Sequence, residues 1–398
     1  MPRLLTLEDL DLATLRGIHV LVRVDFNVPL KDGAVADDAR LVEALPTIRE
    51  LSGLGARLLL CSHLGRPKGE RHPKYSLAPV AQRLAELLER PVAFASDCLG
   101  SAVETTAARL EDGDVALLEN LRFHPGEEKN DPEFARALAA PARAYVDDAF
   151  GAAHRAHASI VGVLERLPRR AAGRLLVREV EALTRLLASP ERPFAAILGG
   201  AKIEGKIDTL ENLLPRLDAL LVGGGMANTF LAARGLDLKD SLVERERLEL
   251  AREIDRRAAA RSIELLLPTD LVVADSLEQP TEIRTVAAGE VPDGFRALDI
   301  GPETRAAFAA AIARARTLFW NGPLGVFEKP PFDQGTRAVA ESLAACSGFT
   351  VIGGGETVAA ARQAGVAGDL GHVSTGGGAA LEFLAGRELP GVAALARD

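Results

Sequence analysis

The sequence predicts an α/β protein with two Rossmann-like domains, each a parallel sheet with helices on both faces, joined by a helix. Short apolar runs recur along the 398-residue chain, and longer segments with apolar residues at helical spacing lie between most of them. This alternation is typical of βαβ units, whose parallel strands are buried on both faces and therefore form continuous apolar runs. One open sheet rarely holds so many strands, which favours two domains.

The expected strands follow one another along the chain. They are the runs at 20–24, 57–61, 115–119, 144–148, 195–199, 219–223, 264–268, 317–321 and 350–354. Residues 77–91 have apolar side chains at i, i+3 and i+4, which predicts an amphipathic helix. Residues 173–189 carry a longer helical pattern that ends at a Ser-Pro pair. We expect this segment to connect an N-terminal domain at 1–172 to a C-terminal domain that begins at residue 190.

Composition and charge exclude several classes of protein. The net charge is −9, so neither a nucleic-acid-binding surface nor an anionic-membrane surface is expected. No apolar stretch is long enough to span a membrane, and the N-terminus turns acidic before a signal-peptide core forms. The three cysteines form no C-x-x-C pair and no zinc-spaced cluster with histidine. We therefore expect a cytoplasmic protein without disulfides or structural metal, with Cys61, Cys98 and Cys346 buried and inert.

In the first half of the chain, Arg and His follow the expected strands, where ligands of parallel sheets bind. These junctions are 23–29, 62–69, 119–128 and 147–159. Asp25 and Asn27 would add polar groups for a hydroxyl-bearing substrate. Arg is the most frequent basic residue of this chain, so one Arg taken by itself is accounted for as a surface cation. Guanidinium groups match carboxylate and phosphate oxygens, so together they would form an anion pocket, with these members: Arg23, Arg40, His63, Arg66, Arg122 and Arg155.

In the second half the corresponding junctions carry glycine. They are 198–206, 222–230, 320–328, 352–360 and 374–384. Two or three glycines between a strand and a helix let backbone N–H groups approach an anion, and the helix N-terminus adds a favourable dipole. The alternative is that each glycine run is a tight turn or a close packing contact. None matches G-x-x-x-x-G-K-[ST] or G-x-G-x-x-G, which disfavours both a P-loop NTPase and a dehydrogenase with a dinucleotide fingerprint.

Four charged residues near these glycines are candidates for contacts with a nucleotide. Lys202 and Lys206 are four apart, so at a helix start they would share one face and suit phosphate oxygens; the alternative is an exposed helix face. Glu356 follows the glycines at 353–355 and is either a dipole partner at a helix start or a ligand of Mg²⁺ beside bound phosphates. Glu328 would accept from ribose hydroxyls or be an ordinary loop carboxylate.

Nine of these motifs together resemble those of the phosphoglycerate kinase family, in the same order and from about residue 20 to residue 380. They are RVDFNVPLKDG (23–33), SHLGRPKG (62–69), ENLRFHPGEE (119–128), DAFGAAHRAHAS (148–159), LGGAK (198–202), GGGMANTF (223–230), NGPLGVFE (321–328), GGGET (353–357) and HVSTGGGA (372–379). Agreement of nine motifs in register is highly specific.

The resemblance implies a two-domain kinase, usually monomeric, that transfers phosphate between ATP and the carboxylate of 3-phosphoglycerate, giving ADP and 1,3-bisphosphoglycerate. It implies that the C-terminal domain ends near residue 384 and that residues 385–398 fold back onto the N-terminal domain. It assigns the phosphoglycerate to Asp25, Asn27, Arg40, His63, Leu64, Gly65, Arg66, Arg122 and Arg155. It assigns ATP or ADP, with Mg²⁺ on Glu356, to Lys202, Lys206, Glu328, Gly354, Gly355, Glu356 and Thr357.

The sequence departs from the family pattern at a few positions. Glu356 stands where the family usually has Asp, so metal contact there is either direct or through water. Asp147 replaces the usual Asn, and Ala152 replaces the usual Thr. Between the two lysines, Glu204 and Gly205 replace the commoner small or acidic pair. None of these changes removes a residue assigned to chemistry.

The reaction fits the residues found. The acceptor carboxylate is already ionised, so no general base is needed, and positioning and charge neutralisation carry the catalysis. We expect Arg40 and Lys202 to supply the catalytic charges from the two domains, which must close on each other about the 173–189 helix. A catalytically silent protein of the same fold is the alternative, although it would be expected to have lost Arg40, Lys202 or the glycine run.

Overall fold

The computed structural model describes residues 3–397, and its chain forms two compact units. Unit 1 runs to Glu181 and includes the segment from Glu388 onwards, while unit 2 is Ala182–Arg387. The boundary at 181/182 lies inside helix α6 (Arg174–Ala188). No helix among the described residues is long and apolar enough to cross a membrane.

Unit 1 is built on a six-stranded sheet in the order β5-β6-β4-β1-β7-β8, in which every pair of neighbours is parallel. Side chains alternate along β1: Val20, Val22 and Val24 enter one apolar cluster and Leu21 enters the other. The sheet is therefore covered on both faces. The strands are β1 (His19–Val24), β4 (Arg57–Cys61), β5 (Ala93–Ala95), β6 (Val115–Leu118), β7 (Ala144–Asp148) and β8 (Arg170–Ala172).

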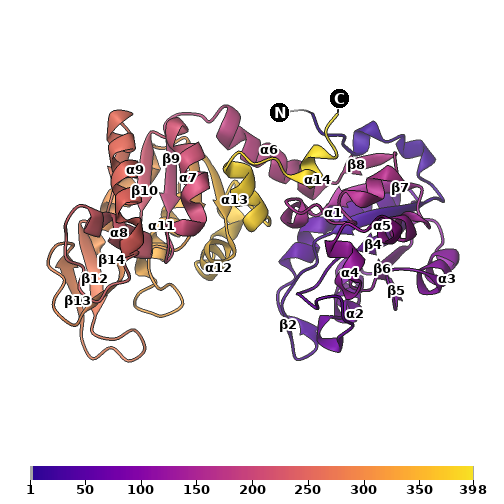
Figure 1. The fold of residues 1–398 in the computed structure, drawn as a ribbon, viewed down its shortest axis with the longest axis horizontal. Helices are drawn as coiled ribbons and strands as arrows, with labels where there is room; N and C mark the ends of the chain where they lie inside the picture. The colour runs from indigo at the N-terminus through magenta and orange to yellow at the C-terminus, as the bar shows by residue number, and fades with distance from the viewer. Residues whose placement is uncertain (1–2, 398) are drawn as a thin grey trace. The chain divides into compact units, whose positions relative to one another are not determined.

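Helices cover the two faces of this sheet separately (Figure 1). Apolar residues of α1 (Ala39–Gly53) and α2 (Ala78–Leu88) join the first cluster, and those of α3 (Ser101–Arg109) and α5 (Pro132–Ala139) join the second. A short helix α4 (Pro125–Glu128) precedes α5. The C-terminal helix α14 (Pro390–Ala393) belongs to unit 1, since the Gly391 amide donates to the carbonyl of Ala153 at 2.9 Å.

Unit 2 contains a second six-stranded parallel sheet, in the order β11-β10-β9-β15-β16-β17. Its strands are β9 (Phe194–Leu198), β10 (Ala219–Val222), β11 (Glu264–Leu266), β15 (Thr317–Asn321), β16 (Phe349–Gly353) and β17 (His372–Val373). Apolar residues of α10, α11 and α12 pack on one face of it. The helices are α7 (Ile207–Leu213), α8 (Gly224–Ala233), α9 (Leu248–Ala260), α10 (Pro302–Arg314), α11 (Gln334–Ala344), α12 (Gly355–Gln363) and α13 (Gly378–Leu384). The predicted α/β fold class with two parallel sheets is therefore confirmed.

The sequence did not predict the antiparallel parts of the molecule. Unit 2 carries a three-stranded sheet of β12 (Asp270–Ala274), β13 (Ile283–Ala287) and β14 (Arg296–Ile300), with β12 in the middle. Unit 1 carries a two-residue ladder between β2 (Leu30–Lys31) and β3 (Ala34–Val35). The strands β2, β3 and β13 are largely exposed and show no apolar run, which is why they were missed; β12 is buried and apolar, and it was not recognised.

Candidate functional site

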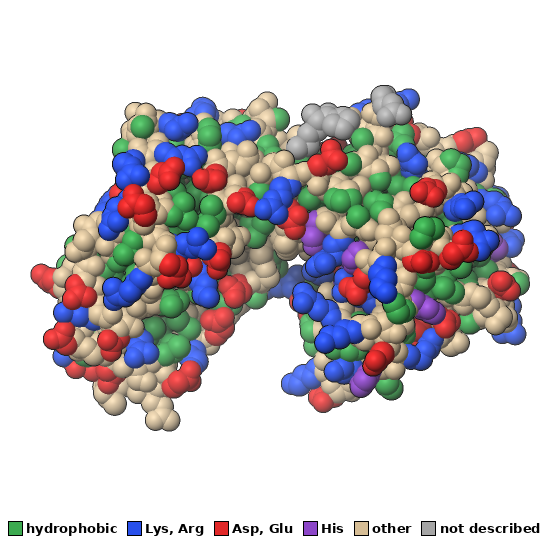
Figure 2. Space-filling model, viewed as in Figure 1, with side chains coloured by type: hydrophobic (Ala, Val, Ile, Leu, Met, Phe, Trp, Pro, Cys, Tyr) green, Lys and Arg blue, Asp and Glu red, His purple; other side chains and the backbone are tan. Residues whose placement is uncertain are grey.

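The cationic residues of unit 1 gather at one edge of its sheet. Strands β6, β4, β1 and β7 are adjacent and parallel, so the loops that follow them meet beyond their carboxyl ends. Figure 2 shows Lys, Arg and His side chains concentrated on this unit around β2, α2 and α4. The junctions predicted from the sequence are therefore brought together by the order of the strands.

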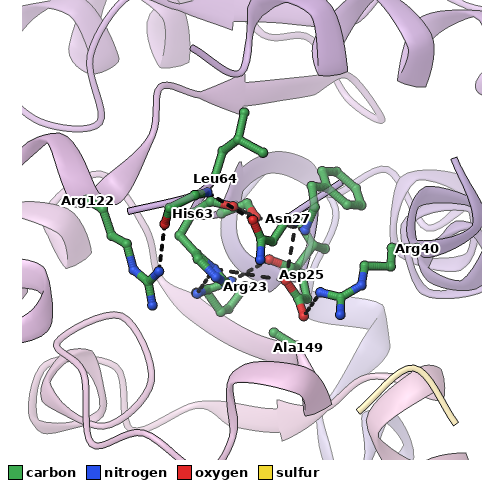
Figure 3. Close-up of polar contacts among 12 residues, drawn as sticks. Arg23, Asp25, Asn27, Arg40, His63, Leu64, Arg122 and Ala149 are labelled. Carbon is green, nitrogen blue, oxygen red and sulfur yellow. Dashed lines mark hydrogen bonds and ion pairs between the residues drawn. The ribbon is translucent and has the colours of Figure 1, made fainter. Parts of the chain in front are cut away.

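Asp25 lies between two cationic or ionisable side chains (Figure 3). Its carboxylate forms an ion pair with Arg40, and one of its oxygens is 3.9 Å from Nδ1 of His63. On the same loop, the Asn27 side-chain oxygen accepts from the Gly65 amide after β4 at 2.9 Å, and the Gly65 carbonyl accepts from Arg122 after β6 at 2.8 Å. These contacts hold the three loops in one arrangement.

Arg23 lies beneath this cluster, 1% exposed. Its Nε donates to Oγ of Ser159 at 2.9 Å, and that hydroxyl donates to the buried carboxylate of Glu127 at 2.6 Å. Burial opposes the charge of Arg23, but Glu127 and other nearby acidic groups outweigh it and raise the pKa of the guanidinium. Ser159 and Glu127 could not be recognised from the sequence as partners of Arg23, because only folding brings them to it.

Two histidines of the cluster are neutral. Burial lowers the pKa of His63 well below 6.5, and the nearby Arg23, Arg122 and Arg40 lower it further. Burial, followed by Arg122 and Arg23, lowers the pKa of His157 to about 4. The positive charge at this edge is therefore carried by guanidinium groups, as an anion site that works over a wide pH range requires.

The remaining predicted residues of unit 1 lie on the same loops. Leu64 is buried, and its amide donates to the Asn120 side chain at 3.2 Å. Arg155 is half-buried and close enough to Arg122 to lower the pKa of that guanidinium, after the larger effect of burial. Arg66 is exposed and forms no hydrogen bond or ion pair through its side chain within residues 3–397. The structure thus links most of the predicted set, with Arg66 at its edge.

Unit 2 contains a cavity of about 610 Å³ beyond the carboxyl ends of its strands. Glycine turns line one part of it, including Gly200, Gly224 and Gly225. Apolar side chains line another part, including Leu271, Leu298 and Val326. Both Glu328 and Glu356 reach its surface, and both are exposed. A cavity of this size with an apolar wall and a glycine-lined wall suits a nucleotide.

Three amides in the glycine junctions at 198–206 and 222–230 already have protein acceptors. The amides of Gly199 and Gly200 donate to the carbonyls of Asn321 and Pro323, at 3.0 and 2.7 Å, and the Gly224 amide donates to Leu324 at 3.0 Å. A Cβ at Gly199 would overlap the carbonyl oxygen of Pro323. At these three amides the alternative of close packing between neighbouring turns therefore applies, and they are not available to an anion.

The turn before α12 is different. Gly354 has a φ of +93°, and the first helical amide with a protein acceptor is that of Val358, which donates to Gly354. Within residues 3–397, the amides of Gly355, Glu356 and Thr357 have no protein acceptor. This helix N-terminus is thus open to an anion, in agreement with the expectation for the 352–360 junction.

The two lysines do not share a helix face, so that expectation is wrong. Lys202 lies in irregular chain and is exposed, whereas Lys206 ends a 3₁₀ turn (Glu204–Lys206) directly before α7. The turn is held by Glu244, whose carboxylate accepts from the Ile203 amide. Lys206 is half-buried and its ammonium donates to the carbonyls of Gly199 and Asn321. Burial lowers the pKa of Lys206 to about 8, although the carboxylate of Glu356 acts in the opposite direction.

The residues around α12 fit a bound Mg²⁺. Glu356 offers an exposed carboxylate at the cavity, and one carboxylate plus substrate phosphates is a usual way to hold Mg²⁺. Among the described residues, Oδ1 of the buried Asn321 also has no hydrogen-bond partner, and this side chain lies against the Gly354 turn. Hard oxygen donors are therefore concentrated where nucleotide phosphates would meet the helix N-terminus.

The cysteines differ slightly from expectation. Cys61 and Cys98 are buried, and burial raises the pKa of Cys61 to about 12, but Cys346 is only half-buried. Folding also brings ligand atoms of Asp97, Cys98 and His124 within 4.8 Å of one another, which the sequence spacing did not indicate. Asp97 already pairs with Arg71 at 2.9 Å and with His124 at 2.7 Å, so its charge is neutralised without a metal.

The chain matches the family model described as phosphoglycerate kinase over residues 7–387. It is 56% identical to the phosphoglycerate kinase of Moorella thermoacetica over 391 residues, 98% of each chain. It is 54% identical to that of Thermomicrobium roseum over 393 residues, 99% of each.

Solved structures agree with these matches. The phosphoglycerate kinase of Coxiella burnetii superposes with a TM-score of 0.89 at 41% identity, covering 99% of both chains. That of Pyrococcus horikoshii gives 0.85 at 34% identity, covering 98% of both. The predicted family, fold class and enzyme class are thereby confirmed, and nothing in these matches supports the silent alternative. A match of this extent and identity shows that the chain belongs to the phosphoglycerate kinase family and is a phosphotransferase.

Proposed function

We propose that this enzyme transfers phosphate reversibly between ATP and the carboxylate of 3-phospho-D-glycerate, giving ADP and 1,3-bisphosphoglycerate, with each sheet edge holding one substrate. The observation that carries the proposal is the chemical difference between the two edges. Unit 1 concentrates guanidinium groups, whereas unit 2 pairs an open helix N-terminus with a cavity of nucleotide size. In the predicted domains, the phosphoglycerate would bind within 1–172 and the nucleotide within 190–384, and residues 385–398 would complete the first.

The phosphoglycerate would lie among the loops that follow β1, β4, β6 and β7. Arg122, Arg155 and Arg66 would face its anionic groups, since guanidinium groups pair with phosphate and carboxylate oxygens in two-point contacts. His63 would donate from its ring, together with the backbone at Leu64 and Gly65. Asp25 and Asn27 would bind the hydroxyl group. Arg40 already contacts Asp25, so it would lie beside the carboxylate that accepts the phosphate.

The nucleotide would place its phosphates at the N-terminus of α12. The amides of Gly355, Glu356 and Thr357 and the dipole of this nine-residue helix favour negative charge there. Lys206 lies close enough to Glu356 to feel its charge, so its ammonium can turn from protein carbonyls to phosphate oxygens. Glu328 would accept from the ribose hydroxyls.

Members of this family take a nucleotide substrate, generally with Mg²⁺, and the proposed ligand here is Glu356. When bound, Mg²⁺ neutralises charge on the nucleotide phosphates. The chain's own contribution is the carboxylate at the second residue of α12 and, beside the Gly354 turn, the Asn321 oxygen, which has no partner within the part of the chain that the structure describes.

Charge neutralisation and alignment would supply the catalysis. The carboxylate acceptor needs no general base, so neither His63 nor His157, although neutral, is assigned that role. We assign the neutralising role at the moving phosphoryl group to Arg40 and Lys202. Because the two substrates are assigned to different units, transfer requires domain closure about the 173–189 helix, which would also exclude water. We further propose a cytoplasmic monomer without a nucleic-acid partner.

The test is Arg40→Ala, with Arg136→Ala as the matched control. Arg136 is an exposed arginine of α5 whose ion-pair partner among residues 3–397 is Glu133, three residues away. In a coupled assay for ATP formation from 1,3-bisphosphoglycerate, Arg40→Ala should lower kcat by roughly a hundredfold or more, and the control should change it little. The affinity for Mg-ADP, measured by calorimetry, should stay near that of the unmodified enzyme. Equal loss of Mg-ADP affinity would refute the division of roles, and an unmodified enzyme without turnover would restore the silent alternative.

A further inference from the structure

The buried contact between Arg23 and His63 determines where the imidazole proton lies. Nη2 of Arg23 is 3.1 Å from Nδ1 of His63, and the two residues are 1% and 7% exposed. A guanidinium group has only donors and stays protonated in proteins. Nδ1 must therefore be the acceptor, which leaves the single ring proton of the neutral imidazole on Nε2.

Arg23 is held in this orientation from several sides. Its Nε donates to Ser159 at 2.9 Å, and Nη1 donates to the carbonyl of Val24. The Ser159 hydroxyl donates to the Glu127 carboxylate at 2.6 Å, so the hydrogen bonds diverge from Arg23, reaching Glu127 through Ser159 on one side and His63 on the other. The buried carboxylate of Glu127 balances the buried guanidinium, which keeps Arg23 in place.

The surrounding charges favour the same state. Burial, followed by the charges of Arg23, Arg122, Arg40 and His157, lowers the pKa of His63, so these groups favour the neutral imidazole. Asp25 is the acidic group near Nδ1, at 3.9 Å, and its carboxylate is already paired with Arg40. Within residues 3–397, Nε2 of His63 has no hydrogen-bond partner. Its N–H is therefore available to a ligand.

We propose that Arg23 is a positioning residue that fixes His63 as the neutral imidazole with its proton on Nε2. His63 then offers the anionic substrate a permanent hydrogen-bond donor. The opposite tautomer would present a lone pair to an anion and lose that bond. An imidazolium would add a positive charge that varies with pH. The substrate role of His63 rests on the proposed function, whereas the tautomer itself does not.

The first test reads the tautomer in the substrate-free enzyme. Protein labelled with ¹⁵N-histidine gives separate signals for protonated and unprotonated ring nitrogens, and His63→Gln identifies the signals of His63. We expect an unprotonated Nδ1 and a protonated Nε2, unchanged between about pH 5 and pH 8. A protonated Nδ1, or an imidazolium in this range, would overturn the inference.

The second test separates positioning from general structural support. Arg23→Met combined with Glu127→Gln removes both buried charges together, so neither is left unpaired. We expect this pair to mix the two tautomers and to raise KM for 3-phosphoglycerate by roughly 10- to 100-fold, without changing the affinity for ADP. Arg23→Lys should keep the wild-type tautomer, because an ammonium also donates to Nδ1. This variant is the one to measure if the double variant does not fold.

A double-mutant cycle completes the design. In a His63→Leu background, Arg23→Met with Glu127→Gln should add little further loss of substrate affinity, since Arg23 acts through the imidazole. Fully additive losses would contradict the proposal. If the unmodified enzyme fails to turn over 3-phosphoglycerate, the proposed function fails while the tautomer spectrum still decides the role of Arg23.

Discussion

Lys206 provides a quantitative link between the structure and nucleotide binding. Burial lowers the pKa of its ammonium to about 8, and in the substrate-free protein the group donates to two backbone carbonyls. Phosphate oxygens would stabilise the charged form and return the pKa to its usual range. Binding should therefore take up a proton above pH 8, and ADP affinity should fall as the pH rises through this value.

The size of the effect follows from the pKa. If only the ammonium form binds, the dissociation constant for ADP should rise about tenfold between about pH 7 and about pH 9, or roughly 1.4 kcal/mol. Calorimetry in buffers of different ionisation enthalpy would count the protons taken up. The single tryptophan, Trp320, gives a second signal, because its indole N–H donates at 2.8 Å to Gly322, which adjoins Lys206.

Two variants make the test decisive. Lys206→Met should weaken ADP binding at neutral pH and remove the pH dependence above pH 8. Lys202→Met is the matched control: it removes the other lysine of the 198–206 junction, so affinity should fall while the pH dependence remains. A dissociation constant that is flat from about pH 7 to about pH 9 in the unmodified enzyme would refute the reasoning.

Three further predictions follow from individual contacts. Mg²⁺ should increase ADP affinity, and Glu356→Gln should reduce this increase by roughly tenfold in calorimetry, whereas Glu356→Asp should preserve it. An unchanged increase in Glu356→Gln would show that Glu356 is not the ligand. Thr357→Val deprives the buried Gly322 amide of its acceptor at 2.7 Å and should lower the free energy of unfolding, measured in urea, by about 1–3 kcal/mol. Thr357→Ser keeps the hydroxyl and should be close to wild type. Equal losses in the two variants would show that packing, not the hydrogen bond, is responsible. Burial raises the pKa of Asp148 from 3.8 to about 7, so between these pH values the folded state holds a proton that the unfolded state releases. The free energy of unfolding should therefore fall as the pH rises through that interval, by about 2–4 kcal/mol at most. Asp148→Asn keeps an acceptor for the Leu175 amide and should flatten this dependence, measured by urea denaturation at about pH 5 and about pH 8; an unchanged slope would assign it to other carboxyls.

Much of the fold could be predicted because buried parallel strands are locally distinctive. The strands β4, β7 and β15 occupy the predicted ranges 57–61, 144–148 and 317–321. Short strands such as β5, β8 and β17 were missed because two or three residues carry no periodic signal. The exposed β13 was missed because its residues pack against no core and need no apolar pattern.

The site could be predicted only as a set of residues. The helix face proposed for Lys202 and Lys206 was wrong because Glu244, far along the chain, holds the intervening backbone at Ile203. Spacing along the sequence does not report such a contact. In the same way, the sequence placed glycines after several strands but could not tell which amides would be used by neighbouring turns.

The sequence by itself determined the two-sheet α/β class, the contrast between arginine-rich and glycine-rich junctions, and the family, because these depend on residue types and their local order. Only the tertiary structure decided that α12 keeps its N-terminal amides open, that Lys206 lies on carbonyls with a lowered pKa, and that Arg23 donates to His63. These properties depend on which distant groups become neighbours and how much water is excluded around them. Both are set by packing.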